Sequence, residues 1–208
     1  MIDLQIDVPE LPSVVLASPV LRQSVADGLN ETLRKARKLG IENITSRVNL
    51  PSRYVSDRVQ ARQATANKLE GRIEARKRGT RLDRYPYSAR KNGARSAGVD
   101  VNITRGTGSL RLYSAFLVRA RRGNEAGAGG MAIAMRKSVA AKLGAGTAAD
   151  RIDWEQATGK RGREYVVLHA LSVEAEFRSV VPAIAPEVER VLQQEVEQKL
   201  SAAGAAKP

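Results

Sequence analysis

Apolar residues recur at helical spacing after Ser18-Pro19, a hydroxyl N-cap followed by a proline suited to a first turn. The pattern predicts a helix over residues 18–40, and basic side chains in its last turn suit the negative end of the helix dipole. A second, shorter helix is expected from Pro51-Ser52 to about Gln60. The apolar positions of the first helix are Leu21, Val25, Leu29, Leu33 and Ala36.

The middle of the chain changes to a period of two, which is typical of strands. Residues 98–104 alternate strictly, and residues 163–170 form a further strand candidate. Residues 69–87 fit a helix or a strand, and we favour a strand. Residues 113–119 and 130–135 flank a glycine-rich loop and predict two strands of one antiparallel meander.

A third helical pattern closes the chain, opened by Pro182 and Pro186. The predicted fold class is therefore α+β, with N-terminal helices, a central, mostly antiparallel sheet and a C-terminal amphipathic helix. We expect residues 1–16 to form an extended arm that docks on another subunit, and residues 17–201 to form a single domain. Within it residues 137–162 are an expected insertion loop, and residues 202–208 a flexible C-terminus.

Composition excludes several classes of chemistry. The 208 residues include no cysteine and one histidine, so the chain has no disulfide, no thiolate zinc site and no multi-histidine metal site. We assign no catalytic residue, cofactor or metal. His169 is interpreted as structural, Gly127, Gly129 and Gly130 as a hairpin tip, and the carboxylates around Trp154 as loop residues. No apolar run is long enough for a membrane span, and no secretory signal is recognised, so we expect an intracellular protein that does not contact membrane.

The charge is large and unevenly distributed. The net charge is +13; residues 51–95 carry 13 Lys+Arg against 4 Asp+Glu, whereas residues 171–200 carry 6 Glu against 3 Lys+Arg. Such asymmetry indicates an anionic or acidic partner, although salt bridges between subunits and solubility alone are the alternatives. The candidate contacts for DNA or a partner are Arg72, Arg76, Lys77, Arg78, Arg81, Arg84, Arg90, Lys91 and Arg95.

The C-terminal helix carries the opposite charge. Its glutamates are candidate contacts to the arginines of a second copy in a head-to-tail arrangement, and the alternative is a solvated helix face. These candidates are Glu187, Glu189, Glu195 and Glu197.

The order and spacing of short motifs resemble the minor tail protein Z family, the tail completion proteins of long-tailed bacteriophages and prophages. The resemblance covers about residues 17–200. Residues 137–161 depart from it. The motifs are the basic helix Val25–Lys38, LPSRYVSDR (50–58), GRIEAR (71–76), LDRY (82–85), AGVDV (97–101), AFLV (115–118), residues 131–136 and HALSV (169–173) ahead of an amphipathic helix.

The resemblance implies a structural role without catalysis, at the head-proximal end of a phage tail that is assembled in the host cytoplasm. The implied partners are the tail terminator, the tail tube, the head–tail connector, further copies in a ring of the tail's symmetry, and the double-stranded end of the packaged DNA. The alternative is a free protein that binds nucleic acid without sequence preference, for which the same arginines would suffice.

Overall fold

The chain divides into two compact units that draw on different parts of the sequence. The computed structural model describes residues 3–7, 17–93, 95–119, 131–140, 142, 152–158 and 164–205. Unit 1 comprises Met1–Ile44, Ser52–Lys77 and Val173–Pro208, and unit 2 comprises Thr45–Pro51 and Arg78–Ser172. We expected one domain over residues 17–201. Periodicity along the sequence does not reveal the division because unit 1 is assembled from both ends of the chain.

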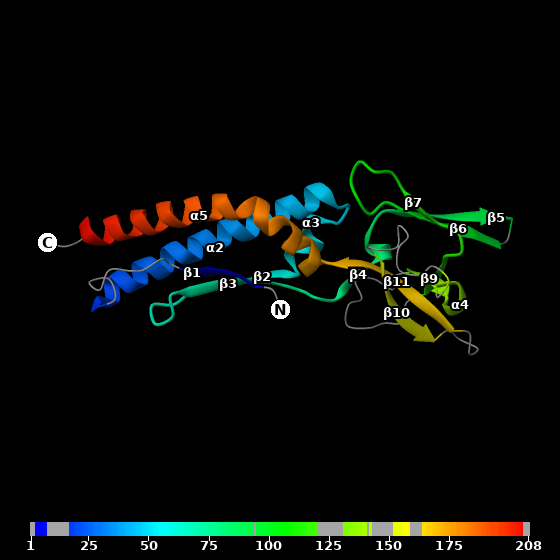
Figure 1. The fold of residues 1–208 in the computed structure, drawn as a ribbon, viewed down its shortest axis with the longest axis horizontal. Coiled ribbons are helices and arrows are strands. Elements are labelled where there is room, and N and C mark those ends of the chain that lie inside the picture. Colours follow the sequence, from blue (N-terminus) through cyan, green and yellow to red (C-terminus); the bar gives the residue numbers. More distant parts are fainter. Residues whose placement is uncertain are drawn as a thin grey trace. The chain divides into compact units, whose positions relative to one another are not determined.

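Unit 1 combines two long helices with a three-stranded antiparallel sheet of order β1-β3-β2. Figure 1 shows α2 and α5 side by side, and contacts of α2 near its start with the end of α5 make the pair antiparallel. The α+β class is confirmed. The elements are β1 Asp3–Asp7, α2 Pro19–Arg47, whose last three residues belong to unit 2, α3 Ser52–Ser56, β2 Val59–Arg62, β3 Glu70–Ala75 and α5 Val173–Ala205.

Glycines allow the layers of unit 1 to approach closely. A Cβ at Gly28 would lie 3.1 Å from the Val196 Cα on α5, so the two helix backbones are nearly in contact there. A Cβ at Gly71 on β3 would overlap the Leu33 side chain of α2, and one at Gly40 would overlap the Phe177 ring of α5. The core of unit 1 therefore lies between α2, α5 and the sheet.

Gly40 explains why the first predicted helix is too short. We expected it to end there, but α2 continues to Arg47. Gly40 is a site of close packing under Phe177, and the tertiary contact outweighs the weak helix propensity of glycine.

The predicted start of the last helix is also wrong. The helix α5 begins at Val173, and Pro182 and Pro186 lie inside it. Both prolines are exposed, so water can satisfy the carbonyl groups that lose their helical partners. Helix is maintained there because Val180 and Ile184 are buried on the opposite face.

The second predicted helix is shorter than expected. The helix α3 ends at Ser56, and residues 59–62 form strand β2. Val59 is fully buried and stands opposite Ala75 of β3, so the pairing partner, which lies far along the sequence, decides the conformation. The preferred strand within residues 69–87 is confirmed for β3, which ends at Ala75.

Unit 2 contains two further antiparallel sheets. One has the order β10-β11-β9-β8 with β4 paired to β11, and the other has the order β5-β6-β7. We expected one central sheet, whereas the strands that the structure describes form three separate sheets. The elements are β4 Gly79–Arg81, the 3₁₀ helix η1 Leu82–Arg84, β5 Tyr87–Asn92, β6 Arg95–Val101, β7 Leu110–Leu112, β8 Phe116–Arg119, β9 Met131–Arg136, α4 Lys137–Ala140, β10 Ile152–Thr158 and β11 Glu164–Ser172.

The predicted meander is confirmed, because β8 pairs antiparallel with β9. The predicted insertion loop over residues 137–162 instead contains α4 and β10, which pairs along its whole length with β11. Acidic and apolar residues alternate in IDWEQ, and the pairing with Val166–Ala170 stabilises them as a strand. The glycine-rich tip and Asp150 lie outside the described residues.

The predicted arm at the start of the chain and the predicted flexible segment at its end both contain regular secondary structure. Within the predicted arm, Asp3–Asp7 is strand β1 on the sheet of its own chain, paired with β3. The alternation of Leu4 and Ile6 with polar residues suits that edge position. The predicted flexible C-terminus begins too early, because α5 continues through Ala205 in an alanine-rich sequence. The rest of both end segments lies outside the described residues.

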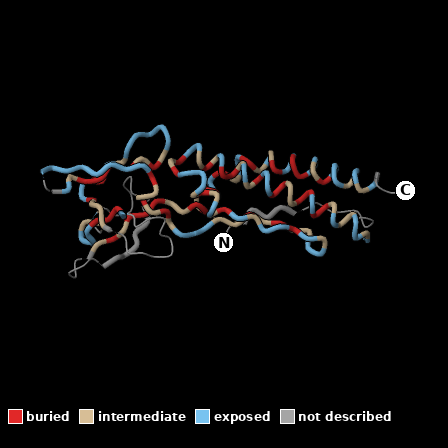
Figure 2. Tube along the Cα trace, turned by 180° about the vertical axis from the view of Figure 1, so that it is seen from behind, coloured by how far each residue is buried: buried red, intermediate tan, exposed pale blue. Residues whose placement is uncertain are grey.

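Strand β5 is the most solvent-exposed strand whose side chains the structure describes. All six of its residues are exposed, and Figure 2 shows this strand in pale blue. Its neighbour β6 contributes Val99 and Val101, both fully buried. One side of β6 therefore packs against the core of unit 2, whereas neither side of β5 is buried by it.

Candidate functional site

The open side of the β5-β6-β7 sheet carries two arginines held by one carboxylate. Asp100 on β6 stands opposite Arg111 on β7, and Arg90 on β5 stands opposite Gly98. Arg90 Nε donates to Asp100 Oδ2 (2.5 Å), and Arg111 Nε donates to Asp100 Oδ1 (3.0 Å). Asp100 is buried, but the side chains of Arg90 and Arg111 are 51% and 42% exposed. We call these three residues and Tyr113 the arginine face.

The charges in the arginine face stabilise one another. The hydrogen bond from Arg90 is the main cause that lowers the pKa of Asp100, burial opposes it, and Arg111 adds to it. The bond to Asp100 in turn raises the pKa of Arg111, with Tyr113 contributing. At neutral pH the two guanidinium groups and one carboxylate have a net charge of +1. A guanidinium has five N–H donors, so the bond to Asp100 leaves donors for an anion.

Tyr113 lies beside Arg111 and is 72% exposed. The Arg111 Cζ is 5.6 Å from the centroid of its ring. The turn that carries Tyr113 is fixed: Ser96 Oγ donates to the Ala115 carbonyl (3.1 Å), and the Ala115 N–H donates to the Leu112 carbonyl (3.1 Å). The backbone of the turn that carries this exposed ring is thus hydrogen-bonded to Ser96 of β6 and within itself.

Gly98 is required for this arrangement. Its φ of +112° disfavours other residues, and a Cβ there would lie 2.7 Å from the Leu112 carbonyl oxygen and 3.0 Å from the Tyr113 Cα. The close approach of β6 to this turn therefore sets the position of the Tyr113 backbone.

The predicted basic set is divided between the two units. Arg72, Arg76 and Lys77 belong to unit 1, whereas Arg78, Arg81, Arg84, Arg90, Lys91 and Arg95 belong to unit 2. Lys77 and Lys91 are exposed. Arg81 binds both oxygens of Asp83 (2.7 and 2.9 Å) and is mostly covered, which gives it a structural role. The side chain of Arg95 lies outside the described part of the chain.

Sequence reasoning missed Arg111 and Tyr113. The signal was present: apolar and basic residues alternate in Leu110-Arg111-Leu112, and Tyr113 directly follows. The dense basic region over residues 51–95 dominates the charge pattern, and Arg111 lies outside it. Strand pairing brings Arg111 close to Arg90 and Asp100.

The sheet of unit 1 has a similar set of side chains, with more acid. Glu74 lies between Arg62 Nε (2.6 Å) and Arg72 Nε (2.9 Å), and the bond from Arg62 chiefly lowers its pKa. On the same strand Glu70 pairs with Lys68 (3.2 Å). Two carboxylates therefore offset two of the three cations that are named here.

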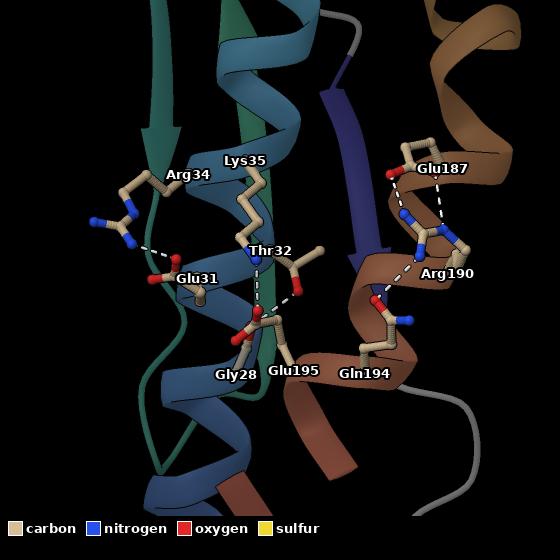
Figure 3. Close-up of polar contacts among 9 residues, drawn as sticks. All are labelled: Gly28, Glu31, Thr32, Arg34, Lys35, Glu187, Arg190, Gln194 and Glu195. Carbon is tan, nitrogen blue, oxygen red and sulfur yellow. Dashed lines mark hydrogen bonds and ion pairs between the residues drawn. The ribbon is translucent and has the colours of Figure 1, made fainter. Parts of the chain in front are cut away.

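The four glutamates predicted to contact another subunit are in different situations. Lys35 Nζ on α2 donates to Glu195 Oε1 (2.6 Å), and the Glu195 side chain is only 12% exposed, so it joins the two helices within the chain (Figure 3). Glu187 accepts from Arg190 Nε on the same helix (3.0 Å). Both bonds are intramolecular, whereas Glu189 and Glu197 are exposed on α5.

The chemistry of the remaining described residues is limited. Within the described ranges, no group of three or more His, Asp or Glu side chains could hold a metal ion. His169 is 3% exposed, and its Nδ1 is 3.2 Å from the Val167 carbonyl oxygen, which suits a structural histidine. None of the helices described is both long and apolar enough to cross a membrane.

Compared with family models, with curated proteins and with solved structures, the chain shows no match. The resemblance to the minor tail protein Z family therefore stays a prediction from the motifs.

Proposed function

We propose that this chain is a structural protein of a bacteriophage or prophage tail, a tail completion subunit at the head-proximal end near the end of the packaged DNA. It acts there as a non-enzymatic component assembled in the host cytoplasm. The order of motifs from Val25 to the last helix supports the proposal, together with the net charge of +13.

The observation that carries the proposal is the exposure of β5. All six residues of this strand are exposed, and among the described strands it pairs with β6 alone, at the edge of its sheet. Open strand edges are liable to pair with other chains. An exposed edge strand of this kind is expected in a subunit whose neighbours cover the strand in an assembly.

The partners in the proposal follow from the position in the particle. They are further copies of the chain in a ring of the tail's symmetry, the tail terminator, the tail tube and the head–tail connector. The exposed Glu189 and Glu197 supply negative charge for a contact with the basic side chains of another copy.

The test is the location of the chain in particles. Immunogold labelling of assembled tails should mark the head-proximal end, and deletion of the coding sequence should give tails that do not join filled heads. A reintroduced wild-type copy is the control and should restore joining. Normal particles from the deletion strain would contradict the proposal.

One observation favours a second candidate function. The arginine face combines oriented guanidinium groups with an exposed aromatic ring, as proteins that bind nucleic acid without sequence preference do. A free nucleic-acid-binding protein would work without tails. Loss of a nucleic-acid phenotype in cells that make no phage particles would favour this candidate over the structural role.

A further inference from the structure

We infer that the arginine face of unit 2 is a nucleic-acid contact, in which Arg90 and Arg111 bind backbone phosphates and an unpaired base stacks on Tyr113. The inference rests on the proposed function, in which the chain lies near the end of the packaged DNA. It names the surface that makes the contact.

The geometry suits a phosphate. Asp100 accepts from the Nε of each arginine, so it holds both guanidinium groups in place on neighbouring strands. Arginines that are already oriented lose less conformational entropy on binding than flexible side chains do. The face keeps a charge of +1, because the pKa of Asp100 is lowered and the carboxylate is ionised at neutral pH.

Tyr113 distinguishes a nucleic acid from an isolated anion. A free phosphate cannot stack on an aromatic ring, whereas a nucleotide has both a base that can stack and a phosphate that can bind arginine. The ring is 72% exposed on a turn that backbone and Ser96 contacts fix. Stacking on such a ring is tolerant of sequence and requires an unpaired base, so single-stranded nucleic acid should bind better than a duplex.

The unit 1 sheet is the alternative location, because Arg62 and Arg72 share Glu74 there and Lys68 pairs with Glu70. What it lacks is a ring for stacking. Among the residues whose burial the structure describes, the exposed aromatic side chains are Tyr87 and Tyr113, and both belong to unit 2.

The experiment measures binding of the purified full chain to a fluorescent oligothymidine of about 20 nucleotides, longer than typical single-strand site sizes. Fluorescence anisotropy over a range of salt concentrations gives Kd and the slope of log affinity against log salt. A duplex of the same length is the second probe.

The test variant is the double substitution Arg90→Gln with Arg111→Gln. Loss of two phosphate contacts should lower the magnitude of the salt slope on the single strand by about 1.4. The matched control is Arg34→Gln with Arg190→Gln, which removes the same charge from arginines that are paired with glutamates on helices (Figure 3) and are 75% and 57% exposed. The control should keep the wild-type slope.

A second variant, Tyr113→Ala, removes the ring from a position too exposed to contribute much to the fold. It should weaken single-strand binding about fivefold or more, with a smaller effect on the duplex and an unchanged salt slope. Circular dichroism and thermal unfolding check that each variant is folded.

Three results would overturn the inference: no binding by the wild-type chain, equal losses in the test and control variants, or an unchanged affinity in Tyr113→Ala. They are distinguishable from failure of the proposed function. If the variants behave as expected but tails lack the chain, the tail role fails and the surface assignment stands; if tails contain a chain that does not bind, only the assignment fails.

Discussion

The two three-stranded sheets of this chain place a carboxylate between two arginines, but they differ in surroundings. In unit 1 Glu74 lies between Arg62 and Arg72, α2 covers the other side of the sheet, and Glu70 on the same strand pairs with Lys68. In unit 2 Asp100 lies between Arg90 and Arg111, beside an exposed Tyr113. Among the residues whose burial the structure describes, the same local chemistry stands beside an exposed aromatic ring in unit 2 and without one in unit 1.

The largest effect should come from the core of unit 1, where α5 packs on α2. Phe177→Ala removes a ring that is 1% exposed against Gly40, and we expect the free energy of unfolding to fall by about 3–5 kcal/mol. Chemical denaturation measures the loss, and hydrogen exchange should show it in α2 and α5. Val20→Ala is the control, since Val20 is 66% exposed; an equal loss there would contradict this account of the core.

A smaller loss is expected in unit 2 from Gly98→Ala. The new Cβ would require an unfavourable φ and would approach the Leu112 carbonyl, so the loss should be about 2 kcal/mol or more. Thermal unfolding measures the loss. Gly106→Ala is a matched control, because Gly106 also has a positive φ but its Cβ would meet no atom within 4 Å. If both variants lose the same stability, backbone strain accounts for the effect and the contact with the Tyr113 turn does not.

These close contacts also show what the sequence could and could not predict. Periodicity predicted α2, α5, the β8–β9 pair and the α+β class, because each depends on local patterns of apolar residues. It failed at Gly40, Pro182 and Val59, where tertiary packing or strand pairing overrides local propensity. The candidate site was predicted only in part for the same reason. Arg90 lies in a region of high charge density, whereas Arg111 is recognised only through its strand pairing with Asp100.

The two carboxylates should affect stability in acid. Arginines lower the pKa of Asp100 below 3.8 and that of Glu74 below 4.5 in the folded chain. Their contribution is therefore fully present above these ordinary values and is lost as the pH falls through the lower folded values. Unfolding measured from pH 7 to pH 3 should show a decline that is shallower in Asp100→Asn and in Glu74→Gln. Curves parallel to the wild type would contradict the assigned pairs.

The smallest effect on stability should come from substituting Glu195 and Glu187, two of the glutamates predicted to contact another subunit. Glu195→Gln weakens the pair with Lys35 that joins α2 to α5, and we expect a loss of at most about 1 kcal/mol because Lys35 is 46% exposed. Glu187→Gln affects only an exposed pair within α5 and should cost less. Denaturant titration of the two variants compares them. A larger loss for Glu187→Gln would contradict the intramolecular role of Glu195.

The most direct test of the central claim is hydrogen exchange of the full chain with and without the single-stranded oligonucleotide. If the arginine face is the contact, exchange slows in β5 and in residues 110–113, and the amides of β2 and β3 are unaffected. Slowing in β2 and β3 alone would place the contact on the unit 1 sheet and contradict the account.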